Sequence, residues 1–230
     1  MYLENVVFDA SAPRELGRFW EAVAAGEQLT DEPAGYETRL SVPGGPELDL
    51  CFQPVPEPAA GSPRLHLDVG GGADEVALLL ALGARRAGAD GGGDQDGVEA
   101  LLDPEGNPFR VVAAGERPLA AIRLESADPE RDVAFWAWLT SWVAVPGAPA
   151  ALRHPSGLGP VLELVPEAGA KGATKNRRHL DLRLEPGDDA VAAGIAARGG
   201  RELPQEWGEL PWRSYADPSG NELCLLPARS

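Results

Sequence analysis

The sequence predicts an α+β protein made of four β-α-β-β-β units that form cupped mixed sheets. Two observations support this fold class. The first is a period-2 alternation of apolar and polar residues, which is typical of strands with one buried face. The second is a tandem duplication, because the same motifs occur twice in the same order along 230 residues. A chain of this length can bury two cores.

A strand that carries a histidine occurs once in each half of the chain. Residues 64–69 read R-L-H-L-D-V, and residues 177–182 read R-R-H-L-D-L. Because successive side chains of a strand point to opposite faces, His66 and His179 are expected on the face opposite the core.

The first unit is expected to contain a strand, a helix and two further strands. The alternating segment 3–9 precedes Pro13, a residue type favoured at the first position of a helix. Apolar residues then recur at helical spacing, at Leu16, Phe19, Trp20 and Val23. Segments 36–42 and 47–53 follow as strands, separated by a Pro-Gly-Gly-Pro turn.

The second unit follows a linker at 54–63 that is rich in Pro, Ala and Gly. After the strand of His66, Asp74 is expected to cap a helix that ends near Gly83. The glycine-rich loop at 88–97 has no lysine and no phosphate-binding pattern, which argues against a nucleotide site.

A D-P-x-G-N motif follows in each half, at 103–107 and at 217–221. Asp at the first position, Pro at the second and Gly at the fourth are typical of a type I turn. In the first half, the turn is expected to connect strands at 98–102 and 108–112.

The second half repeats the first in register. Residues 119–136 align with residues 3–20 without a gap, and the histidine strand and the turn recur in the same order. The helix of the second half is expected to carry Trp136, Trp138 and Trp142. The boundary is expected at 113–118, which gives two tandem domains, 1–115 and 116–230.

Composition excludes several function classes. The formal net charge of −16 argues against nucleic-acid or anionic-lipid partners. Only Cys51 and Cys224 are present, which fits a reducing compartment, and the longest strongly apolar run is far shorter than a membrane span. We expect a soluble cytoplasmic protein, a monomer or homodimer, whose partner is a small molecule.

These motifs together resemble the vicinal oxygen chelate superfamily, which includes glyoxalase I, bleomycin-resistance proteins and extradiol dioxygenases. The resemblance covers nearly the whole chain and rests on the helices that contain Phe-Trp, the two histidine strands and the D-P-x-G-N turns. It implies tandem glyoxalase-like domains in which paired units curl into an open cup. Such a cup holds a ligand and often a divalent metal.

The resemblance also implies positions for metal ligands, on the first and last strands of each unit. In the first half these positions hold Asn5, Asp49, His66 and Arg110. In the second half they hold Ala121, Glu163, His179 and Cys224. Grouped by half, each cup has one histidine and one carboxylate, where metalloenzymes have three or four ligands. We therefore expect no tight metal site, and the weak candidates for Fe, Mn, Ni or Zn are His179, Glu163, Cys224, His66 and Asp49.

Each candidate also has a structural interpretation. A histidine on the cup face is often held by a nearby carboxylate or carbonyl, and a lone cysteine is often buried. Three arginines could bind a carboxylate ligand or pair with acids on neighbouring strands. The arginines are Arg110, Arg123 and Arg183, and the acids are Asp68, Glu125 and Asp181.

Ligand is expected to enter the second cup beneath a lid at 203–212. The ligand-binding candidates are His179, Glu163, Asp181 and Arg123 at the floor, Trp207 and Trp212 in the lid, and His66 in the first cup. A few polar groups with aromatic walls are typical of small-molecule pockets. The first functional hypothesis is a binder with little or no catalysis. The alternative is a metal-dependent lyase, isomerase or dioxygenase, and in a third hypothesis the first half is only a scaffold or dimer surface.

Overall fold

The computed structural model describes residues 1–57, 61, 63–88, 98–113, 118–204, 208 and 210–229. Within these ranges the chain forms four consecutive β-α-β-β-β units, as the sequence predicts. Among the described residues, every helix is too short or too polar to cross a lipid bilayer.

The bounds of the elements follow the repeat. Unit 1 contains β1 (Tyr2–Ala10), α1 (Pro13–Ala24), β2 (Glu27–Glu32), β3 (Gly35–Ser41) and β4 (Glu47–Pro54). Unit 2 contains β5 (Leu65–Gly70), α2 (Ala73–Ala81), β6 (Arg85–Arg86), β7 (Glu99–Leu102) and β8 (Pro108–Val112). Unit 3 contains β9 (Ala121–Ser126), α3 (Pro129–Thr140), β10 (Val143–Val145), β11 (Ala148–Arg153) and β12 (Val161–Pro166). Unit 4 contains β13 (Arg178–Arg183), α4 (Val191–Ala197), β14 (Arg201–Glu202), β15 (Arg213–Ala216) and β16 (Glu222–Leu226).

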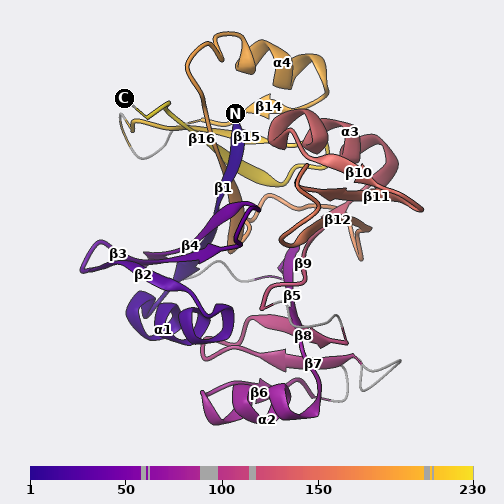
Figure 1. The fold of residues 1–230 in the computed structure, drawn as a ribbon. Coiled ribbons are helices and arrows are strands. Elements are labelled where there is room, and N and C mark those ends of the chain that lie inside the picture. Colours follow the sequence, from indigo (N-terminus) through magenta and orange to yellow (C-terminus); the bar gives the residue numbers. More distant parts are fainter. Residues whose placement is uncertain are drawn as a thin grey trace.

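The strands form two eight-stranded mixed sheets, and each sheet takes strands from both halves of the chain (Figure 1). Sheet A has the order β14-β15-β16-β13-β1-β4-β3-β2 and combines units 1 and 4. Sheet B has the order β10-β11-β12-β9-β5-β8-β7-β6 and combines units 2 and 3. The antiparallel pairs β1–β13 and β5–β9 join the halves.

This topology corrects one expectation. The four-unit α+β fold is confirmed, but the grouping of candidate ligands by half of the chain is wrong. Asn5 and Asp49 lie in sheet A with His179 and Cys224, whereas His66 and Arg110 lie in sheet B with Ala121 and Glu163. Alternation within a strand determines which side chains share a face, but it does not determine which strand lies alongside.

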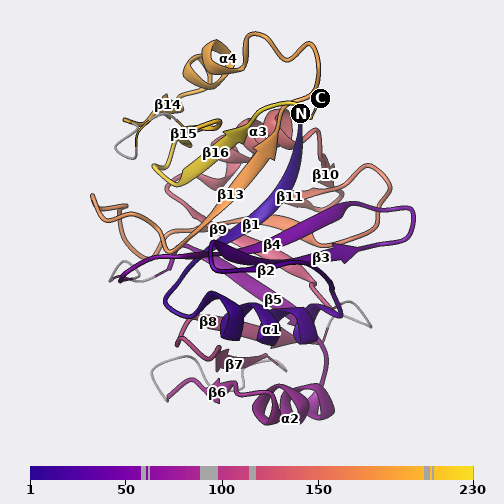
Figure 2. The ribbon, with the colours of Figure 1, turned by 90° about the vertical axis from the view of Figure 1, so that its left-hand side faces the viewer.

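The apolar faces of both sheets contribute to the hydrophobic core. Val6 and Phe8 of β1 are 0% and 1% exposed, and the Phe8 ring lies 5.6 Å from that of Trp20 in α1. Phe19 and Trp20 also contact Phe109 of β8, with ring centroids 6.0 and 5.2 Å apart. Helix α1 therefore lies between strands β2–β4 of sheet A and strand β8 of sheet B (Figure 2).

Each Phe-Trp helix is bound to the D-P-x-G-N turn of the same half. Trp20 Nε1 donates to Asp103 Oδ2 at 3.2 Å, and Trp136 Nε1 donates to Asp217 Oδ2 at 3.2 Å. The turn is closed by the Gly106 amide, which donates to the Asp103 carbonyl at 2.9 Å. Both sequence motifs are thus explained by one buried contact, which ties consecutive units together.

Two local expectations are wrong. Asp74 does not cap α2, because the helix begins at Ala73 and Gly72 occupies the cap position without a side-chain hydrogen bond. Trp142, expected on the helix, lies beyond the end of α3 at Thr140. Both are errors at a helix boundary, which sequence patterns define less well than they define the helix itself.

The second half adds buried polar groups to its helix–turn contact. Asp132 of α3 is fully buried and accepts from Ser126 Oγ at 2.7 Å and also from Ser219 Oγ. Burial raises the pKa of the neighbouring Asp217 to about 6, and the Asp132 charge adds to this rise, against hydrogen bonds from Asn221 and Trp136 that lower it. In the first half, Leu16 stands at the position of Asp132.

The raised pKa of Asp217 predicts a pH-dependent contribution to stability. The folded state binds this proton near pH 6, whereas the unfolded state binds it near pH 4, so stability rises as pH falls through 6. Between pH 7.5 and pH 5, wild type should gain about 1 kcal/mol in free energy of unfolding relative to Asp217→Asn, measured by urea titration. Asp103→Asn, the same change in the first half, should keep the wild-type response. Equal responses of wild type and Asp217→Asn would contradict the prediction.

The indole–carboxylate contact should contribute measurably to stability. Trp20→Phe removes the donor to Asp103, which is fully buried, and should cost about 1 to 3 kcal/mol beyond the lost packing. Trp142→Phe is the matched control, because Trp142 is also buried but its indole nitrogen makes no hydrogen bond within the described part of the chain. Equal losses of unfolding free energy in the two variants would show that the hydrogen bond contributes nothing.

Candidate functional site

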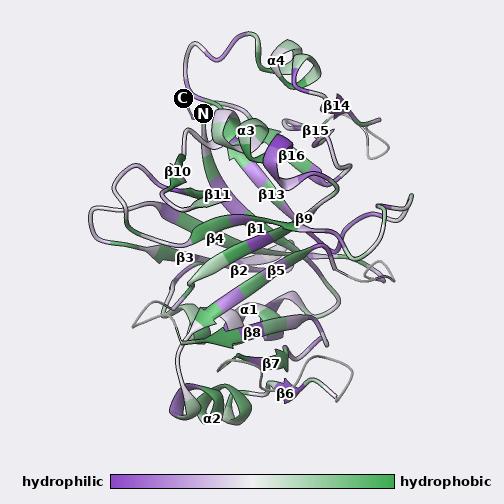
Figure 3. Cartoon of the chain, turned by 90° about the vertical axis from the view of Figure 1, so that its right-hand side faces the viewer, coloured by the Kyte–Doolittle hydropathy of each residue, from purple (hydrophilic) through white to green (hydrophobic). Residues whose placement is uncertain are grey.

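Four polar residues lie side by side across sheet A. Strand register places Cys224 of β16 beside Asp181 of β13, Asp181 beside Asn5 of β1, and Asn5 beside Asp49 of β4. Side chains at paired positions share a face of a sheet. We call this face, opposite the one packed on α1, the polar face of sheet A. Figure 3 shows the alternation of hydrophilic and hydrophobic segments along β1 and β13.

His179, Asp181 and Cys224 form a compact group on the polar face. One potential ligand atom from each lies within 4.8 Å of the others. The three residues are 6%, 7% and 9% exposed. Asn5, from the other half of the chain, donates to Asp181 Oδ2 at 3.1 Å and so orients that carboxylate.

Two atoms of this group have unused hydrogen-bonding capacity. His179 Nδ1 and Asp181 Oδ1 are buried, and neither has a hydrogen-bond partner among the described residues. Asp181 Oδ1 does lie 3.3 Å from His179 Nε2, as an ion pair. Burial lowers the pKa of His179, but Asp181 and Cys224 raise it more, to a net value of about 10. Buried polar atoms without a partner are uncommon in native proteins and require an explanation.

The donor set fits a divalent metal ion. An imidazole, a carboxylate and a thiolate are the ligand types that hold zinc and other first-row transition metals in proteins. A bound ion would satisfy the unpartnered Oδ1 of Asp181. Asp49 does not join them, because Arg39 binds its two carboxylate oxygens at 2.7 and 2.8 Å.

The candidates in sheet B do not form a comparable group. Glu163 lies 3.1 Å from Arg123, and Ala121 carries no donor. His66 Nε2 lies 3.4 Å from Glu125 Oε1. Burial and the Arg178 charge lower the pKa of His66, despite the opposing effect of Glu125. The structural interpretation of His66, a histidine held by a carboxylate, agrees with this contact.

The arginines also pair with acids, although with different partners from those expected. Arg110 Nε donates to Asp68 at 2.8 Å, as expected. Arg123 pairs with Glu163 and Arg183 pairs with Glu4, instead of with Glu125 and Asp181. The difference follows from sheet composition, because β9 and β12 are neighbours, as are β13 and β1.

The expected lid is described at its two ends and at Gly208. Trp207 and residues 205, 206 and 209 lie outside the described residues. Trp212 is half-buried and directly precedes β15, the neighbour of the strand that carries Cys224. The described end of this segment therefore lies at the edge of sheet A nearest the His179 group.

Sequence reasoning missed one pair on the polar face. Cys51 of β4 donates through Sγ to Glu37 Oε1 of β3 at 3.2 Å. Burial raises the pKa of the Cys51 thiol, and the Glu37 charge adds to this effect. The signal was available, because Asp49 and Cys51 alternate with leucine and phenylalanine in 47–53 and so share a face.

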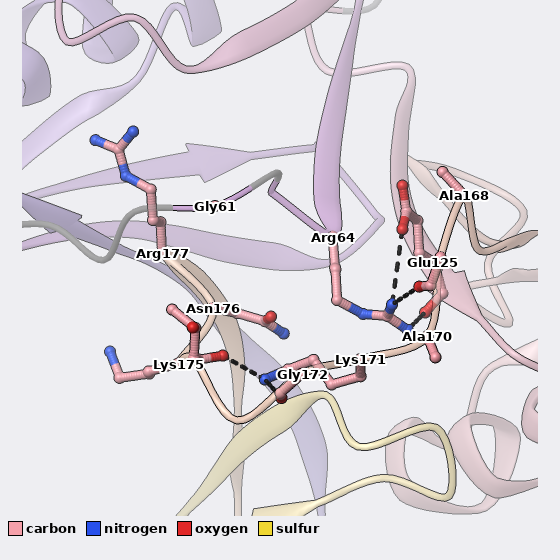
Figure 4. Close-up of a pocket in the computed structure, with 12 residues that line it drawn as sticks. Gly61, Arg64, Glu125, Ala168, Ala170, Lys171, Gly172, Lys175, Asn176 and Arg177 are labelled. Carbon is pink, nitrogen blue, oxygen red and sulfur yellow. Dashed lines mark hydrogen bonds and ion pairs between the residues drawn. The ribbon is translucent and has the colours of Figure 1, made fainter.

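A separate cavity lies at the junction of the two halves. It has a volume of about 390 Å³ and is lined by Arg64, Lys171 and Asn176, among others (Figure 4). Arg64 is bound to Glu167 at 2.7 Å, and Lys171 is bound to Glu222 at 3.0 Å. Acids of the chain therefore already engage both of these cations.

Comparison with known proteins places this geometry in a family. A family model described as a glyoxalase-like domain matches twice, at residues 5–112 and 121–226. Glyoxalase I from Zea mays superposes with a TM-score of 0.65 at 18% identity, over 98% of this chain and 92% of that chain. A putative dioxygenase from Bacillus subtilis gives 0.56 at 14% identity, over 100% of this chain and 86% of that one.

No curated protein matches the chain. At these low identities the similar structures show the shared fold alone. The family model, however, matches most of both halves, in the ranges that contain the histidine strands and the D-P-x-G-N turns. The chain therefore belongs to the glyoxalase-like domain family of the vicinal oxygen chelate superfamily, with two tandem copies of the domain.

Proposed function

We propose that the chain binds a small molecule on the polar face of sheet A, at a divalent metal ion held by His179, Asp181 and Cys224. The observation that carries this proposal is the buried group of three donors within 4.8 Å, two of whose atoms lack hydrogen-bond partners. Desolvating such groups costs free energy that a bound ion would offset.

The metal expectation changes because Asp181, and not Glu163, lies beside His179. With one histidine and one carboxylate per cup, tight binding was not expected. Unit 4 instead supplies Asp181 and Cys224 together with His179, and Asn5 of unit 1 holds Asp181 in place. Three protein ligands of three chemical types support binding of Zn, Fe, Mn or Ni more strongly than two.

A metal-dependent lyase, isomerase or dioxygenase remains the second candidate function. Three protein ligands leave a coordination position for substrate or water, as in catalytic zinc sites. A metal bound there would act as a Lewis acid toward a substrate oxygen. The chain's own contribution would be to orient Asp181 through Asn5 and to exclude water, since the donors are at most 9% exposed.

Sheet B is proposed to act as the scaffold for this site. Two of its arginines pair with acids of the same sheet, Arg110 with Asp68 and Arg123 with Glu163. This modifies the scaffold hypothesis, because the first half still supplies Asn5 to sheet A while its unit 2 contributes to sheet B.

Metal content tests the site directly. Protein purified without chelator should contain about one transition-metal ion per chain by elemental analysis. His179→Ala should lower zinc affinity by more than about tenfold, because one of three ligands is lost. His66→Ala, the matched change in sheet B, should leave metal content unchanged. Metal retained equally by both variants would refute the site.

Trp212 is proposed as an aromatic wall of the binding site, with Trp207 as its expected companion. Thermal-shift screening would first identify a planar ligand. Trp212→Ala should then weaken binding of that ligand several-fold, since two stacked rings contribute roughly 0.5 to 1.5 kcal/mol beyond burial. The melting temperature should change little. Trp138→Ala is the control and should affect melting without affecting binding. Arg198, at the C-cap of α4, places its Cζ 4.1 Å from the centroid of the Trp138 ring. The reverse pattern would assign Trp212 to structure alone.

A further inference from the structure

We infer that the small molecule bound on the polar face of sheet A carries a positively charged group, an ammonium or a guanidinium, which pairs with Glu37. This inference rests on the proposed function and adds the chemical class of the ligand. It is based on a row of side chains across four strands and on how the carboxylates of that face are paired.

Strand register defines the row. His179 of β13 is paired with Val7 of β1, Val7 with Cys51 of β4, and Cys51 with Glu37 of β3. Side chains at paired positions lie on one face. The row therefore runs from the metal-binding group at one end to a carboxylate at the other.

The spacing along the row suits a small molecule. Glu37 Oε1 lies 3.2 Å from Cys51 Sγ, so the carboxylate reaches back toward β4. Strand β4 is two strands from β13, which corresponds to about 10 Å. A ligand that coordinates the metal at His179 and extends about 8 to 10 Å would place its far end at Glu37.

The middle of the row is apolar and buried. Val7 is 4% exposed and Cys51 is 9% exposed. The raised pKa of the Cys51 thiol keeps it neutral at physiological pH, since burial and the neighbouring carboxylates disfavour the thiolate. An aliphatic segment of the ligand suits this apolar stretch of the row, because a polar group there would lack a partner.

Charge pairing singles out Glu37. On the same face, Asp9 is bound by Lys175 at 2.7 Å, Asp49 by Arg39 and Glu4 by Arg183. Within the described part of the chain, Glu37 receives only the Thr30 hydroxyl at 3.1 Å and the Cys51 thiol, and no lysine or arginine pairs with it.

Glu37 is also half-buried, which makes an uncompensated charge costly. A cationic group of the ligand would supply the partner that the neighbouring carboxylates already have. Together with the group of His179, Asp181 and Cys224 at the other end of the row, this defines a site for a ligand with a metal-binding head and a cationic tail.

A pair of hydroxamate probes tests the inference. Hexanehydroxamic acid and 6-aminohexanehydroxamic acid share the metal-binding head and the chain length, and only the second carries an amine. On zinc-loaded full-length protein, calorimetry should show the amino probe binding about five- to tenfold more tightly. Glu37→Gln keeps a hydrogen-bonding side chain at this position and should reduce the two affinities to the same value.

The controls separate this inference from the proposed function. Glu163→Gln, a carboxylate change in sheet B, should retain the preference for the amino probe. Raising salt from about 50 to about 500 mM should reduce the preference of the wild-type protein for the amino probe. This test does not depend on the folding of any variant. If both probes bind wild type equally, the inference fails and the proposed function stands. If zinc is not retained and neither probe binds, both fail.

Discussion

Antiparallel pairing of β1 with β13 is the constraint on which the rest of the structure depends. It joins the first strand of the chain to a strand that begins about 170 residues later, with Asn5 opposite Asp181 and Val7 opposite His179. Through this pairing, a residue of the first half orients a carboxylate of the second. The candidate site is therefore a property of the whole chain, and either half alone would lack part of it.

The indole–carboxylate contacts supply the complementary connection within each half. Asp103 and Asp217 are buried in tight turns, where each also accepts backbone hydrogen bonds, and a buried carboxylate must be hydrogen-bonded to be tolerated. Trp20 and Trp136 provide the remaining donor from the helix of the preceding unit. Strand pairing thus connects the halves, while these contacts hold the two units of each half together.

The two sheets share an architecture but differ in chemistry. On sheet A, His179, Asp181 and Cys224 converge with atoms left unpartnered. On sheet B, Arg110 and Arg123 neutralise Asp68 and Glu163. Opposite charges attract each other more strongly in a half-buried setting than in water, because the effective dielectric constant is lower there. Duplication allows this divergence because each polar face is built from its own pair of units.

The sequence by itself determined the four units, the helices and the faces of the strands. It placed His66, His179 and Asp181 opposite the core correctly, because side-chain direction in a strand depends only on local period-2 geometry. Helical spacing in the segment ending at Trp20 is equally local.

Only the tertiary structure decided which strands are neighbours. The first strands of the four units have similar alternating patterns, so nothing local distinguishes the pairing of β1 with β13 from its pairing with β5. The choice depends on long-range packing of the apolar faces and helices against each other. That choice separated Glu163 and Arg123 from His179 and placed Asn5 beside Asp181, which forms a buried group with His179 and Cys224 of the same unit.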